Sequence, residues 1–460
     1  MSVMDGASFL WQDYLIFSLM LIVSSLIGVF FALRNLKRKE GSSDEMLTGS
    51  RRLSALPVSL SLVASFASAS SLLGIPVQVY TQGGNQIIWA VGIIPCLLIV
   101  AFFIMPIFYR LRLTNAYEYL ELRFNKTIRT IGSVAFSFII LIYMAAALYG
   151  PAVALSQVTG LSRDISMLMI GLVCTFYTSI GGIRAVVWTD AFQILLVFAC
   201  SVLVIAKGAF DAGGWTRVWD LAGRGSRLPY LDMNPDPFLP HTFWTFAIGG
   251  GLNIMTVYGG NQANLQRYGS VRTLGEARGA LLACMVMWVI YISLQCVLGL
   301  VMYALFLTCD PLEAGTVSRK DQLVPLLVMQ TLGAWPGLPG FFVASIFSAS
   351  ISTVSTGINS LAAVTLEDVV KPTYRWMKAD LSEKASYRIT VALGLVFGLL
   401  TVGLGFAVDS LGETAFLITF NVFGMVGSPV LGVIINGVFI RFVNSWVSHH
   451  QPDLYPVCQQ

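Results

Sequence analysis

Long apolar runs separated by short polar stretches form the pattern of this chain. A run of about 20 apolar residues is long enough to cross the hydrocarbon core of a membrane as a helix. The eleven expected spans are Tyr14–Leu33, Ala55–Tyr80, Ile87–Tyr109, Ile131–Leu155, Ile165–Ile183, Ala185–Ala206, Thr242–Ala263, Ala280–Phe306, Gly337–Val370, Ile389–Val408 and Ala415–Ile440. The pattern therefore predicts an all-α polytopic membrane protein.

Composition agrees with this class. Of 460 residues, 56% are hydrophobic and 11% are charged, whereas soluble proteins carry roughly 25% charged residues. The net charge of +4 follows the membrane pattern, so the expected partner is a lipid bilayer and not a nucleic acid. The seven cysteines lie mostly inside apolar runs and show no paired framework. The oligomeric state is left open.

The distribution of Lys and Arg predicts the orientation of the spans. With the N-terminus outside, 21 of the 28 basic residues fall on one side of the membrane. Cytoplasmic loops carry an excess of Lys and Arg, so the richer side is expected to be cytoplasmic. We therefore expect the chain in the cell membrane with its N-terminus outside, its C-terminus in the cytoplasm and no Lys or Arg within a span.

Small hydroxylated residues crowd the ninth span, GLPGFFVASIFSASISTVSTGINSLAAVTLEDVV. Hydroxyls three or four residues apart lie on one face of a helix, and inside a bilayer each needs a partner. That partner is a neighbouring helix, a carbonyl of the same helix, water or a hard cation. For Ser352 and Thr353, beside Ala349, we expect a cation. For any other single hydroxyl, packing between helices is the expectation.

Two spans contain residues that weaken a helix. Gly74-Ile75-Pro76 interrupts the second span, and Gly249–Gly251 with Gly259-Gly260 interrupts the seventh. Interrupted spans at matching places in two halves point to the binding site of a transporter. Spans two to six and spans seven to eleven form two blocks of five. Because each block has an odd number of spans, the second block begins on the opposite side of the membrane and is expected to be inverted relative to the first. Kinks and close packing are the alternative explanation.

Among the acidic residues, Asp190 lies furthest inside an expected span, about 9 Å beyond Arg184 at 1.5 Å per residue. A carboxylate in a membrane is costly and marks a functional site by default. The alternatives are a short reach to the cytoplasmic surface and a hydrogen bond to a neighbouring helix. An enzyme is not expected, because the three histidines lie outside the spans and no metalloprotease motif is present.

Five segments resemble a known family of membrane proteins. They are AYEYLELRF (Ala116–Phe124), YTSIGG with AVVWTD (Tyr177–Asp190), NQANLQRY (Asn261–Tyr268), STVSTGINSLAAVTLED (Ser352–Asp368) and FGMVGSP (Phe423–Pro429). Together they resemble the sodium/solute symporter family, and the last two resemble its branch of multivitamin, monocarboxylate and iodide transporters. The resemblance covers nearly the whole chain.

The resemblance implies a LeuT-type core of five plus five helices in inverted repeat, preceded by one extra N-terminal helix. The implied segments are the N-terminus, first span and cytoplasmic link (1–52), the first repeat (53–207), an extracellular loop (208–240), the second repeat (241–440) and a short cytoplasmic tail (441–460). The family continues for two or three helices after this core, and those helices are not in this chain.

The resemblance also implies site residues. Main-chain oxygens of Ala64, Ala67 and Ala349, with the hydroxyls of Ser352 and Thr353, are the expected sodium ligands. Asp190 is expected at a second sodium site or on the sodium exit route. The expected substrate contacts are Ser71, Tyr143, Tyr149, Asn261 and Phe420, with packing between helices as the alternative for each.

The implied function is sodium-coupled import of a small organic anion or a vitamin-like solute, of monocarboxylate, pantothenate, biotin or iodide type, by alternating access. Sodium is the co-transported ion, and no organic cofactor is expected. A transport-inactive relative that regulates full-length partners is the alternative, motivated by the missing helices.

Overall fold

The computed structural model describes residues 9–37, 51–113, 115–236, 238–410, 414–440 and 443, and the side chains of residues 28–29, 31–37, 176–182 and 409–410 lie outside this description. Most of the predicted cytoplasmic link and tail, and part of the motif from Tyr177 to Asp190, therefore fall outside it. In the described part the structure has helices and one isolated bridge, between Leu53 and Val271, but no strand.

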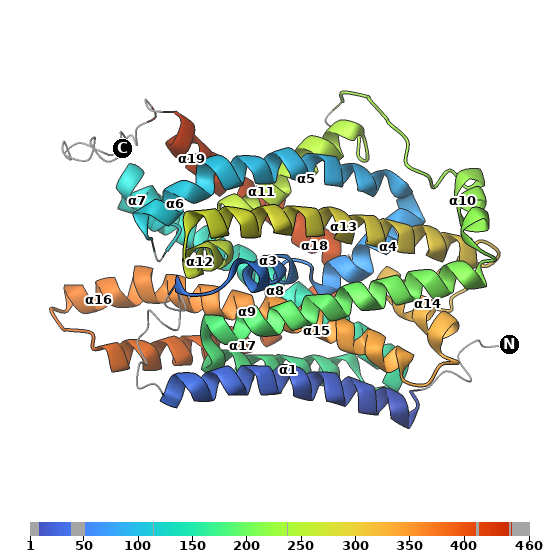
Figure 1. Cartoon of the computed structure of the whole chain (residues 1–460), viewed down its shortest axis with the longest axis horizontal. Coiled ribbons are helices and arrows are strands. Elements are labelled where there is room, and N and C mark those ends of the chain that lie inside the picture. The colour runs from blue at the N-terminus through green and yellow to red at the C-terminus, as the bar shows by residue number, and fades with distance from the viewer. Residues whose placement is uncertain are drawn as a thin grey trace.

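The helices follow one another as Figure 1 labels them. The α-helices are α1 (Trp11–Lys37), α3 (Ala55–Ala64), α4 (Ala69–Gln82), α5 (Ile88–Ile99), α6 (Met105–Leu111), α7 (Glu118–Arg123), α8 (Lys126–Thr159), α9 (Arg163–Asp211), α10 (Trp215–Arg224), α11 (Gly251–Gly259), α12 (Gln262–Ser270), α13 (Leu274–Phe306), α14 (Leu323–Leu332), α15 (Leu338–Thr365), α16 (Lys371–Trp376), α17 (Glu383–Ser410), α18 (Ala415–Val422) and α19 (Ser428–Phe439). Short 3-10 or π segments are η2 (Gly84–Ile87), η3 (Val100–Ile104), η4 (Thr245–Gly250), η5 (Lys320–Gln322), η6 (Leu366–Val370) and η7 (Phe423–Gly427).

Seven helices of the described part are long and apolar enough to cross a membrane, or eight when the bent pair α3 and α4 counts as one span. The all-α membrane architecture expected from the sequence is confirmed. This number is below the eleven expected spans. In α1 the side chains of residues 28–29 and 31–37 lie outside the described part, which leaves the apolar stretch Trp11–Ile27, and the seventh expected span is divided among η4, α11 and α12.

The fifth and sixth expected spans are one element. Helix α9 continues through the expected boundary at Arg184 and has 49 residues. A straight helix of that length measures about 74 Å, more than twice the roughly 30 Å of the hydrocarbon core, so each half has the length of one crossing. The second half, Ile183–Asp211, qualifies as a span by itself.

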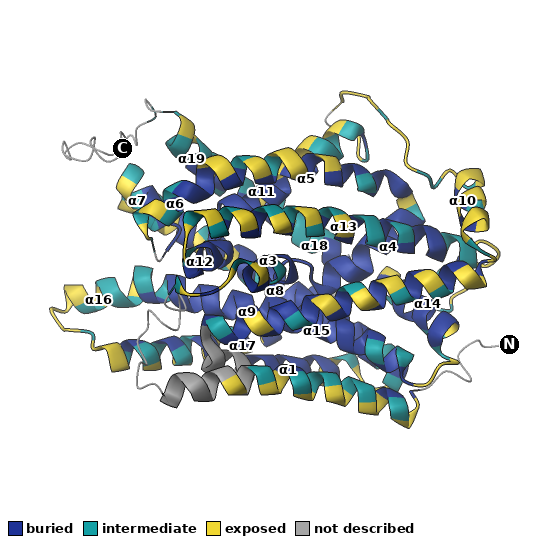
Figure 2. Ribbon diagram, in the orientation of Figure 1, coloured by how far each residue is buried: buried dark blue, intermediate teal, exposed yellow. Residues whose placement is uncertain are grey.

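Helix α15 is the centre of the bundle. In its most apolar stretch 94% of the residues are buried, against 33% for the span of α17 and 22% for the span Ala415–Phe439. Figure 2 shows the same contrast, with α15 dark and yellow patches along the outer helices. The hydroxyls of α15 therefore face other helices and not lipid.

The break in the second span lies earlier than the sequence predicts. Helices α3 and α4 meet at a bend of 59° at residues 65–68, whereas Gly74-Ile75-Pro76 lies inside the continuous helix α4. Neighbouring groups in membrane bundles satisfy the backbone groups that proline frees, so Pro76 is tolerated. The break falls instead in Ser65-Phe66-Ala67-Ser68, where serine hydroxyls compete for backbone hydrogen bonds. The expected position of the break was wrong.

The second break agrees with the sequence. Helix α11 ends at Gly259 and α12 begins at Gln262, so the chain leaves the helix at the predicted glycine pair. The cluster at Gly249–Gly251 serves a different purpose. A Cβ on Gly251 would lie 2.7 Å from the carbonyl oxygen of Gly92, so this glycine allows α11 to approach α5 closely.

Candidate functional site

The hydroxyls of Ser352 and Thr353 lie against the bend between α3 and α4. Ser352 Oγ donates to the carbonyl oxygen of Ala64 at 2.8 Å and lies 3.0 Å from that of Ala349. Thr353 Oγ1 lies 3.2 Å from the carbonyl oxygen of Ser65 and 3.0 Å from that of Ala349. Two residues of α15 thus reach the carbonyls that the bend frees from helical bonding.

This arrangement gathers uncharged oxygens in a buried place. Ala64, Ala349, Ser352 and Thr353 are all buried, and the structure adds the Ser65 carbonyl to the predicted set. Ala67 lies in the same bend, where its N–H donates to Val63. Carbonyl and hydroxyl oxygens are the ligands that a hard cation prefers, so the donor set fits sodium. Clusters of three or more His, Cys, Asp or Glu residues are absent among the described residues.

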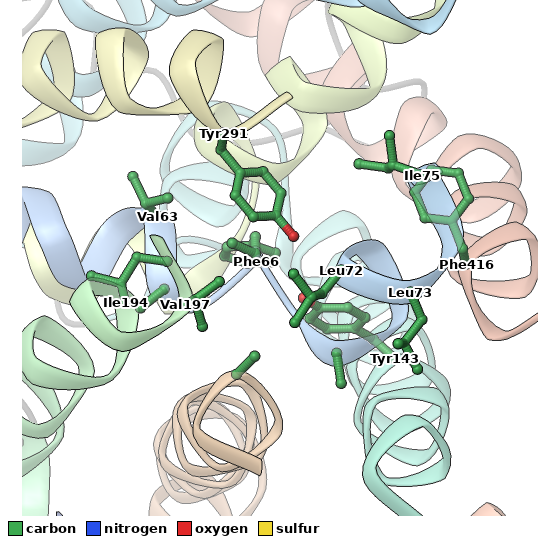
Figure 3. Packing of buried hydrophobic residues seen from close by; sticks show 14 of the residues in the cluster. Val63, Phe66, Leu72, Leu73, Ile75, Tyr143, Ile194, Val197, Tyr291 and Phe416 are labelled. Atoms are coloured by element: carbon green, nitrogen blue, oxygen red, sulfur yellow. The ribbon is translucent and has the colours of Figure 1, made fainter. Parts of the chain in front are cut away.

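Tyr143 connects this oxygen cluster to a cavity beside it. Its hydroxyl donates to the Ser65 carbonyl at 3.1 Å, the same oxygen that Thr353 contacts. Its ring stacks on Phe66 with ring centres 5.6 Å apart, and both residues line the cavity. Figure 3 shows Phe66 and Tyr143 beside the bend, with the Tyr291 hydroxyl directed toward the start of α4.

The cavity is enclosed by aromatic and small polar side chains. Its lining residues are Phe66, Ser68, Ser70, Ser71, Trp89, Tyr143, Asn253, Ile254, Val257, Trp288, Phe416, Thr419, Phe420 and Phe423. They come from the bend and from α4, α5, α8, α11, α13, α18 and η7. The volume is about 50 Å³, below the roughly 300–1,000 Å³ of pockets that hold drug-sized ligands. The structure therefore represents a contracted cavity.

Three of the five expected substrate residues line this cavity: Ser71, Tyr143 and Phe420. Asn261 lies elsewhere, and its side chain caps α12 by accepting from the Ala263 N–H at 2.9 Å. Tyr149 is buried away from the cavity, where its hydroxyl accepts from Arg319 at 2.9 Å. The structure does not bring these two residues to the cavity.

Sequence reasoning missed most of the aromatic lining and one amide. Trp89 and Trp288 lie in apolar spans, where nothing in the sequence distinguishes cavity from lipid-facing positions. Asn253 could have been predicted from the sequence, because polar side chains inside membrane spans usually have a functional role. Its amide donates to the Phe420 carbonyl at 3.1 Å.

Asp190 lies in a buried ion pair that the sequence did not predict. Arg267 Nη2 lies 2.9 Å from Asp190 Oδ2, and the two side chains are 2% and 0% exposed. Ser61 donates to the same carboxylate oxygen at 2.7 Å. The count by sequence position places Arg267 in a loop after the seventh expected span, whereas α12 folds it back into the bundle, where it is buried. A reach of Asp190 to the surface is likewise excluded by its burial.

The ion pair is linked to the oxygen cluster by hydroxyls. Arg267 Nη2 donates to Thr356 at 2.6 Å, and Thr356 Oγ1 lies 3.1 Å from Ser65 Oγ. Asp190 Oδ1 is buried without a hydrogen-bond partner, and so are both amide atoms of Gln193, one turn further along α9. Unpaired buried oxygens of this kind are costly, so they mark a place that a cation or water would stabilise.

A larger groove of about 750 Å³ lies apart from these residues, between α1, α3 and α9. Its lining is apolar, including Leu26, Phe30, Leu60 and Trp188. In a bilayer such a surface faces acyl chains, so it is not part of the site.

Most of the chain matches a family model. The model of the sodium:solute symporter family matches residues 46–446. Among curated proteins, the chain is 41% identical to the sodium-dependent multivitamin transporter of Oryctolagus cuniculus, over 95% of this chain and 68% of that protein. It is 40% identical to the Homo sapiens sodium/iodide cotransporter (94% and 66%) and to the Xenopus laevis sodium-coupled monocarboxylate transporter 1 (95% and 69%).

Solved structures with the same fold are also found. A substrate-bound, outward-open sodium-coupled sialic acid symporter superposes with a TM-score of 0.82 at 23% identity, covering 94% of this chain and 88% of that one. A nucleobase-cation-symport-1 family transporter in a closed conformation gives a TM-score of 0.53 at 12% identity, with coverages of 85% and 95%. At these identities the likeness concerns the fold alone, and it agrees with the predicted LeuT-type core.

Proposed function

Because the chain belongs to the sodium:solute symporter family, we propose that its co-transported sodium binds where α15 meets the bend between α3 and α4. The ligands are the carbonyl oxygens of Ala64, Ala67 and Ala349 and the hydroxyls of Ser352 and Thr353. Two features support this site: the buried, uncharged oxygens around the bend, and the 2.8 Å contact between Ser352 and the Ala64 carbonyl. Sodium replaces these hydrogen bonds with ion contacts that join the two elements.

Sodium and solute are coupled through Tyr143. This residue lines the cavity and also donates to the Ser65 carbonyl beside the sodium site, and this contact is the observation that carries the proposal. A cation that fixes the bend fixes Tyr143 and Phe66, and with them one wall of the cavity. Each sodium that moves down a potential of 100 mV supplies about 2.3 kcal/mol to the cycle.

A second sodium, or the sodium exit route, is proposed at Asp190. The unpaired Asp190 Oδ1 and the unpaired Gln193 amide support it. Hydroxyls of Thr356 and Ser65 lie between this place and the first site. A departing cation competes with Arg267 for the carboxylate, so movement of the ion pair accompanies sodium release.

The proposed solute is a small organic anion or a vitamin-like molecule that contacts Ser71, Tyr143 and Phe420. The relatives named above are transporters of vitamins, iodide and monocarboxylates. The cavity lining contains no Lys or Arg, so negative charge is met by serine hydroxyls and by the N-terminus of α4, which begins at Ala69 beside the cavity. Tyr149 and Asn261 stay predictions from the sequence.

The orientation proposed is N-terminus outside and C-terminus in the cytoplasm, as the Lys and Arg distribution supports. The loop between α13 and α14 then faces the outside, and the ion pair of Asp190 and Arg267 lies toward the cytoplasm. Epitope tags at each end, probed before and after permeabilisation, test this orientation.

Uptake by cells that express the chain tests the function. Labelled lactate, nicotinate, biotin, pantothenate, iodide and, as an uncharged comparison, glucose are offered in sodium and in choline medium, with surface protein quantified. Sodium-dependent uptake of an anion, absent in choline, is the expected result. Uptake of glucose alone contradicts the anionic solute, and equal uptake in both media contradicts sodium coupling.

A further inference from the structure

A groove at one end of the bundle is lined by two arginines and by apolar side chains. Its volume is about 320 Å³, and its lining residues are Phe102, Phe103, Pro106, Ile107, Arg110, Arg278, Val438 and Phe439. They come from η3, α6, the second turn of α13 and the end of α19. Figure 1 shows α6 and α19 at the same end of the bundle, near the first turns of α13. No acidic residue is among the described residues that line the groove.

Three membrane spans meet at this groove. The span Gly84–Leu111 ends one residue after Arg110. The span Leu274–Phe306 begins four residues before Arg278, and the span Ala415–Phe439 ends in the groove itself. The ends of spans lie where the hydrocarbon core of a membrane meets the lipid headgroups. Both arginines therefore lie near the level of the headgroups.

The aromatic walls of the groove face the surroundings of the bundle. Phe102, Phe103 and Phe439 are 48%, 54% and 47% exposed, and the rings of Phe103 and Phe439 pack with their centres 5.6 Å apart. Phe102 and Phe103 belong to the π segment η3, a kind of segment that is frequent at functional sites. Side chains exposed along a membrane span contact acyl chains, so the groove opens into the hydrocarbon of the bilayer.

Arg278 has a hydrogen-bond donor that the described part of the protein does not satisfy. Its guanidinium lies over the ring of Phe102, 5.5 Å from the ring centre. Its Nε is buried and has no hydrogen-bond partner among the described residues. An unmet donor on a charged group beside lipid is costly, so a negatively charged acceptor would stabilise this side chain. Arg110, which is exposed, adds a second guanidinium to the same groove.

The chemistry of the lining favours the phosphate of a lipid. Arginine binds phosphate through two parallel hydrogen bonds, and two arginines without a carboxylate favour a ligand with net negative charge. A soluble phosphate would leave the phenylalanine walls without a partner, whereas a phospholipid covers them with an acyl chain. The proposed orientation places the groove in the cytoplasmic leaflet, which is the leaflet that holds anionic lipids.

We propose that this groove binds one anionic phospholipid of the cytoplasmic leaflet. Its phosphate lies between Arg110 and Arg278, and one acyl chain lies along Phe102, Phe103 and Phe439. The choice of leaflet rests on the proposed orientation. The site itself depends on neither the sodium site nor the solute.

A lipid bound in this groove joins elements that support the buried ion pair. Tyr109, the residue before Arg110, donates its hydroxyl to the Val271 carbonyl at 3.3 Å, where α12 meets α13. Helix α12 carries Arg267, the partner of Asp190. A ligand that binds only the folded protein stabilises it. The bound lipid is therefore expected to hold α6, α13 and α19 together and to raise the melting temperature.

Native mass spectrometry measures the binding directly. The purified chain in detergent is offered equimolar phosphatidylserine and phosphatidylcholine with identical acyl chains, and the ratio of the two lipids retained by the protein is measured. The parent is expected to retain phosphatidylserine in preference. Arg110→Gln combined with Arg278→Gln is expected to lower this ratio about tenfold. An unchanged ratio in the double variant contradicts the proposal.

The matched control removes two other arginines at the same end of the bundle. Arg112 and Arg272 are exposed and are not among the lining residues, so Arg112→Gln with Arg272→Gln changes the net charge by the same amount. This variant is expected to keep the ratio of the parent. An equal fall in both double variants would show attraction by general surface charge and would overturn the site.

Ile107→Trp tests the groove without changing a charge. The larger side chain fills the space between the walls, so this variant is also expected to lose the preference for phosphatidylserine. Because it keeps both arginines, it tests the site even where the arginine double variant does not fold. The melting temperature of each variant in phosphatidylcholine shows whether it is folded. An undiminished preference in a folded Ile107→Trp variant contradicts binding in the groove.

Glycerophosphoserine, which has the same headgroup without acyl chains, distinguishes a lipid from a soluble phosphate. Phosphatidylserine is expected to raise the melting temperature of the parent and of the variant with Arg112→Gln and Arg272→Gln. Glycerophosphoserine at the same concentration is expected to leave both unchanged. An equal rise with glycerophosphoserine would contradict a lipid ligand. Neither measurement depends on transport, so a failure of the proposed function leaves these results unaffected.

Discussion

Arg267 on α12 and Asp190 on α9 form an ion pair 2.9 Å apart with both side chains buried. Arg267 also donates to Ser61 on α3 at 2.7 Å and to Thr356 on α15 at 2.6 Å. The guanidinium thus joins four helices at one point. Removing one partner of a buried pair leaves the other charge without compensation, which costs more than the pair itself contributes.

Arg267→Met is therefore expected to lower the free energy of unfolding by about 3 kcal/mol. Thermal unfolding of the purified protein, followed by fluorescence in detergent, measures this change. The double variant Arg267→Met with Asp190→Asn is expected to recover most of the loss, because neither charge is left alone. Arg272→Met, on an exposed arginine nearby, is the matched control. A double variant no more stable than the single one would contradict the pairing.

The proposed sodium site predicts different consequences for substitutions at two neighbouring hydroxyl residues of α15, Thr353 and Ser350. Thr353→Ala removes a proposed ligand and is expected to raise the sodium concentration for half-maximal uptake at least tenfold, equivalent to about 1.4 kcal/mol. Thr353→Ser keeps the hydroxyl and is expected to stay near the parent value. Ser350 donates to the Ala147 carbonyl at 2.8 Å, away from the site, so Ser350→Ala is expected to leave sodium dependence unchanged. Equal effects of Thr353→Ala and Ser350→Ala on the sodium concentration for half-maximal uptake would contradict the proposal that Thr353 is a sodium ligand.

The two tyrosines of α8 are expected to behave differently. Tyr143→Phe loses the bond to Ser65 between the sodium site and the cavity, so both the apparent solute affinity and the sodium dependence of uptake are expected to weaken about tenfold. Tyr149→Phe loses its bond with Arg319, away from the cavity, and is expected to leave solute affinity within about twofold. A large loss of affinity in Tyr149→Phe would instead place that residue at the substrate.

Asp13 of α1 caps the central helix from outside it. Its Oδ1 accepts from the N–H groups of Gly337 and Gly340 at 2.9 and 3.1 Å. Asp13→Ala is expected to destabilise the fold by about 1–2 kcal/mol, because two N–H groups at the start of α15 lose their acceptor. Asp164→Ala, at an exposed residue in the first turn of α9, controls for loss of an acidic side chain. Equal melting temperatures of the two variants would contradict the role of Asp13.

The sequence predicted what depends on local chemistry. The hydroxyls of Ser352 and Thr353 and the break at Gly259-Gly260 were visible because serine, threonine and glycine have few other reasons to gather in a membrane span. The membrane class followed from hydropathy alone. These features require no knowledge of which helices touch.

The features that were missed depend on tertiary contacts. Pro76 is a stronger helix breaker than any residue of the Ser65–Ser68 segment, yet the break lies at the serines, because Ser352, Thr353 and Tyr143 satisfy the carbonyls freed there. Arg267 lay in an expected loop, and only the fold brings it to Asp190.

Sodium-dependent stabilisation tests the central claim most directly, because it requires no solute. A cation that binds the folded protein raises its free energy of unfolding by RT ln(1 + [Na⁺]/Kd), so the melting temperature of the parent and of Ser350→Ala is expected to rise with sodium at constant ionic strength in choline. In Thr353→Ala this rise is expected to shift to much higher sodium or to disappear. An undiminished rise in both Thr353→Ala and Ser352→Ala would place the sodium site elsewhere and contradict the account.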